Sequence, residues 1–272
     1  MPFVDLHTHS HYSDGADAPA DVVARAVRAG ATALAITDHD TVGGVAEGRQ
    51  AAAAAGLDYL SGVEVSSTFE RQELHVVGLG IDDASPTLRQ RLDELAGDRR
   101  ERFERILARL EELGVPVDVD AGGVSGEGVP GRLHIARALR DAGYTRTTQE
   151  GFDGYIGIGR PAYVPKRLVS AEEAVAMVQE AGGLAFVAHP GLGNTVRRLL
   201  PRLLELPFDG IEAYHVSHSD ARTDTLLALA KERGLLVAGG SDCHGSIKDR
   251  PLLGSVRVPR EHYERIRERL GS

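Results

Sequence analysis

Histidines and acids with the spacing of metal ligands occur near both ends of the sequence. The segment DLHTHSHYSDG carries His7 and His9, and the segment GSDCHG carries Asp242 and His244. On an extended strand, residues i and i+2 point to the same side, so each pair can hold one ion from two positions. Imidazole nitrogen combined with carboxylate oxygen, with almost no sulfur, suits Mn, Fe or Zn better than Ca or Mg. The spacing therefore predicts a site for divalent metal ions.

Most short apolar runs in the chain are followed directly by histidines or acids that could bind a metal ion. In a parallel α/β barrel the carboxyl ends of the strands converge on one face, so residues far apart in the sequence would meet there. Buried ionisable groups must be paired, neutralised or bound to a metal, and so many in one place would need more than one ion. Beyond the two pairs above, the candidates are Asp38, His39 and Asp40 after ALAIT, Glu64 after YLSGV, His75 within ELHVVGLG and His189 after LAFVA.

Strand and helix patterns alternate along most of the chain. Apolar runs such as FVDL, ALAIT and LAFVA are separated by amphipathic helical patterns. This order favours a closed or nearly closed parallel barrel, or a doubly wound sheet. Glycines mark where helices should end, at Gly30, Gly56, Gly182 and Gly234.

The alternation stops between Asp83 and Pro161. A long amphipathic pattern, SPTLRQRLDELAGDRRERFERILARLEELG, is followed there by the glycine-rich DAGGVSGEGVPG and a shorter helical pattern, RLHIARALRDAG. We therefore expect residues 1–83 and 161–272 to form the barrel, and residues 84–160 to form a mostly helical insertion that covers or supports the site. The run of Arg and Glu over residues 98–105 is interpreted as a solvated helix face, not as a nucleic-acid contact.

Composition and charge exclude several classes of protein. A net charge of -9, a pI near 5.7 and the absence of Trp argue against a protein that coats long nucleic acid. The single cysteine, Cys243, excludes an intramolecular disulfide and thiolate-rich metal sites, and we interpret it as a packed thiol. We find no leader-like segment and no membrane-length apolar run, so no membrane partner and a cytoplasmic location are expected. The G-x-G-x-x-G, P-loop and G-x-S-x-G patterns are missing, which disfavours Rossmann or Walker nucleotide binding and serine hydrolases.

At these residues the sequence resembles the PHP (polymerase and histidinol phosphatase) family of metal-dependent phosphoesterases, within the amidohydrolase superfamily. The resemblance is carried by DLHTHSHYSDG, ITDHDT, GVEVS, AHP and GSDCHG, and it covers essentially the whole chain. It implies a distorted seven-stranded (β/α) barrel and two to three divalent ions, Mn²⁺ before Fe²⁺ or Zn²⁺. Short members with a helical insertion are similar to phosphatases that remove the 3′-phosphate from adenosine 3′,5′-bisphosphate, and to relatives that trim short oligoribonucleotides from the 5′ end.

The same resemblance implies three groups of ligands. Many family members have a histidine where this chain has Asp14; the carboxylate matches the nucleotide-directed branch, although it could also weaken the third group. Asp5 and Asp40 would orient ligand imidazoles from behind. One ion would be held by His7, His9, Glu64 and Asp242; a second would share Glu64 and add His75 and His189; a third would take Asp14, His39 and His244.

These ligands predict hydrolysis by a hydroxide that bridges two ions. Metal ligation lowers the pKa of a bound water from about 15.7 toward about 7, and the hydroxide would attack phosphorus in line with the departing oxygen. Asp242 is predicted to be essential as a ligand, and His218 to protonate the leaving oxygen as general acid. Basic residues would hold the phosphate and the nucleotide; the candidates are Arg132, His134, Arg137, Arg160, Lys166 and His218.

The expected substrate is a small phosphorylated nucleotide or a short oligoribonucleotide. Histidinol-phosphate phosphatase would use the same chemistry on another leaving group. A module that binds metal or nucleotide without turnover would use the same ligands, so these two alternatives stay open. The oligomeric state is not predicted. His11, His215 and His262 are interpreted as structural or exposed.

Overall fold

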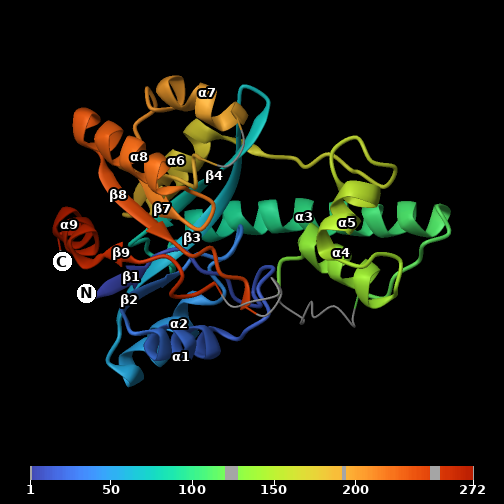
Figure 1. The fold of residues 1–272 in the computed structure, drawn as a ribbon, viewed down its shortest axis with the longest axis horizontal. Coiled ribbons are helices and arrows are strands. Elements are labelled where there is room, and N and C mark those ends of the chain that lie inside the picture. The colour runs from blue at the N-terminus through green and yellow to red at the C-terminus, as the bar shows by residue number, and fades with distance from the viewer. Residues whose placement is uncertain (1, 120–127, 192–193, 246–251, 272) are drawn as a thin grey trace.

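A strongly curved β-sheet forms a barrel wall in the computed structural model, which describes residues 2–119, 128–191, 194–245 and 252–271 (Figure 1). Two further strands of two residues each flank this wall. The wall strands are β1 (Phe3–Asp5), β2 (Ala31–Ile36), β3 (Asp58–Phe69), β4 (Gln72–Leu79), β6 (Leu184–Val187), β7 (Gly210–His215) and β8 (Leu236–Gly240); the flanking strands are β5 (Val169–Ser170) beside β3 and β9 (Val258–Pro259) beside β1.

The wall comes close to closing on itself between its first and last strands. Within the described residues, seven strands follow one another in the order β1-β2-β3-β4-β6-β7-β8. The N–H of Leu6 donates to the carbonyl of Gly239 (3.1 Å), and Thr8 forms a parallel bridge with Cys243. The predicted distorted seven-stranded α/β barrel is therefore confirmed, and Cys243 is buried in the seam as a packed thiol.

One strand, β4, runs against its neighbours. It forms an antiparallel hairpin with β3 through a turn in which Glu70 and Arg71 have positive φ, and it also pairs antiparallel with β6. An all-parallel wall was the wrong expectation here, because a tight turn and not a helix joins β3 to β4. The reversal has a consequence for the site: His75, in the first half of β4, lies at the same edge as the carboxyl ends of β3 and β6.

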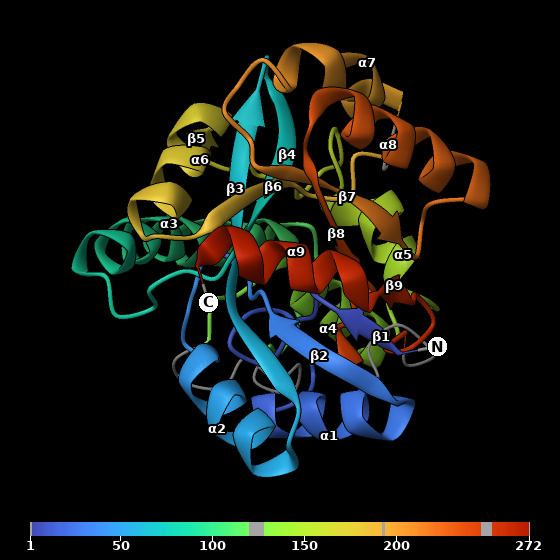
Figure 2. The ribbon, with the colours of Figure 1, turned by 90° about the vertical axis from the view of Figure 1, so that its left-hand side faces the viewer.

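Helices cover the outside of the wall (Figures 1 and 2). Ser170 caps α6 by accepting from the N–H of Glu173, whose carboxylate in turn accepts from the N–H of Ser170. The predicted helix ends at Gly30, Gly56 and Gly234 are confirmed, each with a left-handed backbone. The helices around the wall are α1 (Pro19–Ala29), α2 (Val45–Ala55), α6 (Ala171–Glu180), α7 (Asn194–Leu203), α8 (Asp220–Arg233) and α9 (Arg260–Leu270).

The long helix α3 (Pro86–Glu112) belongs to two hydrophobic cores. Leu88, Leu92 and Leu95 in its first half pack in the barrel core with side chains of α6. Ile106 and Leu110 in its second half pack in a separate core built with α4 (Arg132–Asp141), the short α5 (Thr148–Gly151) and the π-helical turn η2 (Phe152–Ile156). Figure 1 shows α3 running from the barrel out to α4 and α5.

The inserted part is helical, as expected, but its packing boundaries differ from residues 84–160. The first half of α3 packs with the barrel, and Ala162 and Val164 pack in the outer core. The glycine-rich stretch at 120–127 lies outside the described residues. None of the helices in the described ranges combines the length and apolar character that crossing a membrane requires.

Candidate metal centre

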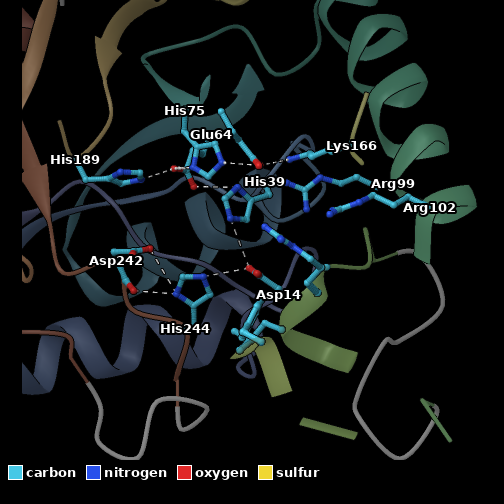
Figure 3. Close-up of a pocket in the computed structure, with 15 residues that line it drawn as sticks. Asp14, His39, Glu64, His75, Arg99, Arg102, Lys166, His189, Asp242 and His244 are labelled. Carbon is cyan, nitrogen blue, oxygen red and sulfur yellow. Dashed lines mark hydrogen bonds and ion pairs between the residues drawn. The ribbon is translucent and has the colours of Figure 1, made fainter. Parts of the chain in front are cut away.

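Ligand-type side chains from six strands, or from the loops after them, meet at the carboxyl edge of the barrel (Figure 3). In each of four overlapping groups, the nitrogen and oxygen atoms that could bind a metal lie within 4.8 Å of one another. The groups are His9, Asp14, His39 and His244; His7, Glu64 and His189; His7, His9 and Asp242; and His39, Glu64 and His75.

Glu64 lies at the centre of these groups. Its Oε2 is 3.3 Å from Nε2 of both His7 and His9, and its Oε1 is 2.7 Å from Nδ1 of His75 and 3.0 Å from Nε2 of His189. Burial alone would raise the pKa of Glu64, but the surrounding imidazoles, His39 first among them, hold that pKa well below its ordinary value. The two carboxylate oxygens thus face two different sets of imidazoles.

The distances around His9 fit a common cation. Nε2 of His9 lies 3.2 Å from both Nε2 of His7 and Oδ1 of Asp242. Ligands about 2.1 Å from one ion would be about 3.4 Å apart in a tetrahedral arrangement. Oε2 of Glu64 and Oδ1 of Asp14 are also buried without a hydrogen-bond donor among the described residues. A donor set of imidazoles and carboxylate oxygens at these distances therefore fits divalent metal ions.

Asp14 brings together the side chains expected at a third ion. Its Oδ1 is 3.2 Å from Nε2 of His244 and 4.0 Å from Nε2 of His39, and the ring of His9 stacks on His244 at 4.2 Å. The grouping differs from the expected partition. His9 joins this group as well as the one with His7, Glu64 is grouped with His75 and with His189 separately, and His39 also joins Glu64 and His75.

Glu212, which we did not predict, holds the imidazole of His7 from behind. Its Oε1 is 2.9 Å from Nδ1 of His7, and its Oε2 accepts from the N–H of His189 at 2.8 Å. With Nδ1 committed to Glu212, Nε2 of His7 is left to face Glu64 and Asp242. An acid inside the apolar run GIEAY was the available signal, because a buried carboxylate on a strand needs a partner.

The neighbouring acids tie the ligand loops together instead of facing the imidazoles. Asp38 accepts from the N–H and the hydroxyl of Ser10 and from the hydroxyl of Ser13, at 2.5–2.7 Å, which fixes the loop between His9 and Asp14. Burial raises the pKa of Asp5 to about 6, and its carboxylate accepts from the N–H of Ser241. We expected Asp5 to orient a ligand imidazole. Its carboxylate instead links β1 to the loop after β8.

Three site residues have a left-handed backbone that is unusual outside glycine. The φ angles are 52° at Asp40, 28° at His189 and 50° at Asp242. Such conformations cost about 1–3 kcal/mol each and persist where the surrounding structure enforces them. Their position directly after the strands turns the side chains of His189 and Asp242 back over the barrel mouth.

His215 lies beside the cluster, although we interpreted it as structural or exposed. It is buried at the end of β7, with Nε2 3.5 Å from Oδ2 of Asp242 and its ring 5.2 Å from the ring of His189. His11 stacks on Tyr12 at the surface side of the first loop, and His262 packs on Tyr214. Only His215 of these three contacts a candidate ligand in the described structure.

A cavity of about 310 Å³ opens between this cluster and the inserted helices. Its ligand wall includes Glu64, His189 and Asp242, and a cationic wall faces them across the cavity. Figure 3 shows side chains from α3 and Lys166 reaching toward the cluster. The cationic residues that line the cavity are Arg99, Arg102, Arg132 and Lys166.

Two of these cations correct the interpretation of residues 98–105 as a solvated face. Arg99 is buried on Asp40, and Arg102 lines the cavity, donating from Nε to the carbonyl of Val164 at 2.8 Å. Both lie on the stripe of α3 that carries Leu95 and Ile106 at helical spacing. The available signal was that these arginines lie on the apolar face of an amphipathic helix, and the surrounding run of charges concealed it.

Only some of the other predicted substrate contacts line the cavity. Arg132 and Lys166 line the cavity. His134 is buried, with its Nδ1 accepting from the N–H of Gly131 (3.1 Å) at the start of α4, so it serves to cap that helix. Arg137 is partly buried on α4 and Arg160 is exposed, and neither lines this cavity.

His218 is held by the backbone at both ring nitrogens. Its Nδ1 is 2.9 Å from the carbonyl of Ala213, and its Nε2 accepts from the N–H of Gly191 at 3.0 Å. This pattern fixes a neutral tautomer, and burial lowers the pKa of His218. The geometry therefore does not support the predicted role of general acid, because no ring N–H is left for a leaving oxygen.

The chain is similar to known proteins in both sequence and structure. The PHP domain family model matches residues 5–158. A 3′,5′-nucleoside bisphosphate phosphatase of Chromobacterium violaceum is 39% identical over 251 residues, which cover 90% of this chain and 88% of that protein. The 5′-3′ exoribonuclease Rnm of Escherichia coli is 34% identical over 247 residues, covering 88% and 84%. A crystal structure from Bifidobacterium adolescentis, assigned to the metal-dependent phosphoesterases, is similar with a TM-score of 0.89 at 29% identity, covering 98% and 96%.

Proposed function

The chain belongs to the PHP domain family, and from that membership we propose that it is a metal-dependent phosphoesterase acting on phosphate esters of nucleotides. The substrates proposed are 3′,5′-bisphosphonucleotides, which would lose the 3′-phosphate, and short 5′-phosphorylated oligoribonucleotides. One observation carries the proposal: a buried cluster of imidazoles and carboxylates around Glu64 faces a cationic wall across a cavity of about 310 Å³. The relatives named as a bisphosphate phosphatase and an exoribonuclease support the same substrate class.

The ligand cluster would hold two to three divalent ions, with Mn²⁺ proposed ahead of Fe²⁺ or Zn²⁺. His7, His9, Glu64 and Asp242 would hold one ion, with Glu64 shared toward His75 and His189, and Asp14, His39 and His244 would hold another. Ions bound there supply an activated water at neutral pH and neutralise the charge that builds up on phosphate oxygens.

The protein's own residues would position the substrate against this cluster. Arg99, Arg102, Arg132 and Lys166 present positive charge to an anionic ester, and a planar guanidinium can bind two phosphate oxygens at once. The ligand wall and the cationic wall together allow the reacting phosphate to be held with its ester oxygen pointing into the cavity. His189 and Asp242, both in left-handed turns, contribute their side chains to the ligand wall of the cavity.

The cationic wall also discriminates between the proposed function and its alternatives. Histidinol phosphate carries an ammonium group and a single phosphate, so the cationic wall, in which Arg102 and Arg132 have no paired carboxylate among the described residues, would repel its organic part. A nucleotide bisphosphate instead brings a second anion to the same wall. A module that binds without turnover would have the same ligands, and only an assay separates it from an enzyme.

The test is a phosphate-release assay on protein purified without added metal and analysed for its metal content. We expect stoichiometric divalent metal, and release of phosphate from adenosine 3′,5′-bisphosphate at a kcat/KM well above that for histidinol phosphate. Release that is faster from histidinol phosphate would assign the alternative enzyme. Full metal content with no turnover of either compound, or of a 5′-phosphorylated oligoribonucleotide, would leave only the binding module.

A further inference from the structure

One ring nitrogen of His215 is a buried donor that has no hydrogen-bond partner at the edge of the ligand cluster. The N–H of Ser217 donates to Nδ1 of His215 at 3.1 Å, so Nδ1 is an acceptor and the proton of the neutral ring is carried by Nε2. His215 is only 4% exposed, and among the described residues Nε2 forms no hydrogen bond. Buried donors are almost always satisfied in folded proteins, so this one requires an explanation.

The carboxylate of Asp242 is the acceptor that this donor faces. Oδ2 of Asp242 lies 3.5 Å from Nε2 of His215, slightly beyond the length of a hydrogen bond. Oδ1 of the same carboxylate is turned the other way, 3.2 Å from Nε2 of His9 and 3.8 Å from Nε2 of His7. One oxygen of Asp242 thus faces a candidate ion group, and the other faces His215.

An irregular stretch of β7 brings His215 to this position. Glu212 and His215 are three residues apart, and on a regular strand their side chains would point to opposite faces of the sheet. The pairing of β7 with β8 shifts register between Glu212 and Tyr214, so that both Glu212 and His215 reach the ligands. The shift requires a glycine on β8, because a Cβ at Gly239 would overlap with the carbonyl oxygen of Tyr214.

We propose that His215 is a positioning residue for Asp242. Its Nε2 donates to Oδ2 and thereby holds Oδ1 toward the ion that His7 and His9 would bind. This inference rests on the metal ligands of the proposed function. Asp242 lies after the end of β8, and a donor on one oxygen stops its carboxylate from rotating about the bond to Cβ. A ligand that is already oriented loses less conformational freedom when it binds an ion, so the ion binds more tightly.

A neutral imidazole suits this role better than a cationic side chain would. A lysine or arginine beside Oδ2 would compete with the ion for the negative charge of Asp242. The N–H of Ser217 fixes the tautomer of His215 that places a proton on Nε2. The ring therefore supplies a directed donor and leaves the charge of the carboxylate to the metal.

Asn and Gln at position 215 separate the two ring nitrogens in an experiment. In His215→Asn, the amide oxygen replaces Nδ1 and keeps the contact with Ser217, but no donor reaches Asp242. In His215→Gln, the longer side chain carries its amide N–H group to the region of Nε2. Metal-free protein is titrated with Mn²⁺ and the free ion is followed by electron paramagnetic resonance, so binding is measured without turnover.

The expected result is a loss of metal affinity in one variant and its rescue in the other. His215→Asn should weaken the binding of an ion about 10- to 100-fold, and His215→Gln should stay within about threefold of the wild type. His11→Asn, at a ring that stacks on Tyr12 away from the ligands, is the matched control and should bind Mn²⁺ as the wild type does.

A double-mutant cycle tests whether His215 acts through Asp242. Once Asp242→Asn has removed the charged ligand, adding His215→Asn should change the remaining affinity by less than about twofold. Losses that simply add would overturn the proposal, because they would show that the two residues act independently.

Three further results would also overturn it. These are wild-type affinity in His215→Asn, a loss in His215→Gln as large as that in His215→Asn, and a lower melting temperature of metal-free His215→Asn that accounts for its weaker binding. The last would assign His215 a structural role. A wild type that binds no divalent metal would instead end the proposed function. A wild type that binds Mn²⁺ but hydrolyses no nucleotide would contradict the proposed activity and leave this test of His215 valid.

Discussion

Oε1 of Glu212 lies 2.9 Å from Nδ1 of His7, and this contact directs Nε2 of His7 toward Glu64. Replacing the carboxylate in Glu212→Gln removes the charge that holds the ring and keeps the side-chain volume. We expect metal affinity to fall about 10- to 100-fold, because partners behind a ligand imidazole have effects of that size. Titrating activity against Mn²⁺ measures the change.

Glu205→Gln, at an exposed acid that precedes β7 in the sequence, is the control and should bind metal as the wild type does. Unchanged metal affinity in Glu212→Gln would show that the contact with His7 is not needed to orient the ring. Circular dichroism on both variants separates this result from loss of the fold.

Removing a proposed ligand should abolish most activity. His9 and Asp242 approach each other at 3.2 Å, and each belongs to a candidate ion group. We expect His9→Ala and Asp242→Asn to lower kcat/KM by at least about 100-fold together with metal content. His11→Ala, at a ring that stacks on Tyr12 away from the ligands, should stay within about twofold. Wild-type turnover by the ligand variants after chelation would contradict the metal assignment.

Arg99 should contribute more to stability than its position in a charge run suggests. Arg99→Met leaves the carboxylate of Asp40 buried, and breaking a buried pair in this way costs about 3–5 kcal/mol. Urea unfolding measures the change. Arg100→Met, the exposed neighbour, should lie within about 0.5 kcal/mol of the wild type. Adding Asp40→Asn to Arg99→Met should recover part of the loss if the unpaired charge is its cause.

Substrate binding should weaken in mildly alkaline solution because of Lys166. Burial and the charge of Arg99 lower the pKa of Lys166 to about 8, although Asp40 and Glu73 act in the opposite direction. The ammonium is present below pH 8 and is lost as the pH rises through 8, so KM should be constant below that value and increase above it. The expected increase is up to about tenfold.

Lys166→Arg keeps a charge at every pH in this range, so it should remove the increase in KM. A KM profile with the same inflection in wild type and variant would assign the titration to another group.

His218 should be dispensable for proton transfer, since both of its ring nitrogens are bound by Ala213 and Gly191. We expect His218→Asn to lower kcat less than about tenfold and to leave the shape of its pH profile unchanged. A general acid would instead contribute about 10²- to 10⁴-fold, and its loss would remove one limb of that profile. The pH dependence of kcat in both proteins decides between these outcomes.

The parts of the site that follow strand ends could be predicted from the sequence, and those that depend on packing between distant segments could not. His7 and His9 follow an apolar run in the chain, and the same holds for Asp242 and His244, so strand topology alone brings them to one edge. Glu212 was missed because a single acid inside a strand has no spacing to mark it.

The cationic wall was concealed for a different reason. Arg99 and Arg102 stand in a run of charged residues, which by itself predicts a solvated helix face. Only the helical spacing from the neighbouring leucines shows that both lie on the buried face of α3. The two backbone partners of His218 could not be predicted from the sequence, because backbone groups leave no trace in the side-chain pattern. The reversed direction of β4 followed from the length of one turn, which hydrophobic periodicity does not report.

The single unbroken helix α3 restricts how the gene for this protein can vary. Adding or deleting one residue between Leu95 and Arg102 would turn the outer half of the helix by about 100° relative to the barrel half. Arg102 would then swing out of the cavity while the outer core kept its own contacts. Insertions and deletions should therefore be tolerated after Leu110, in the connections between the outer helices. They should not be tolerated within α3, which joins the two cores.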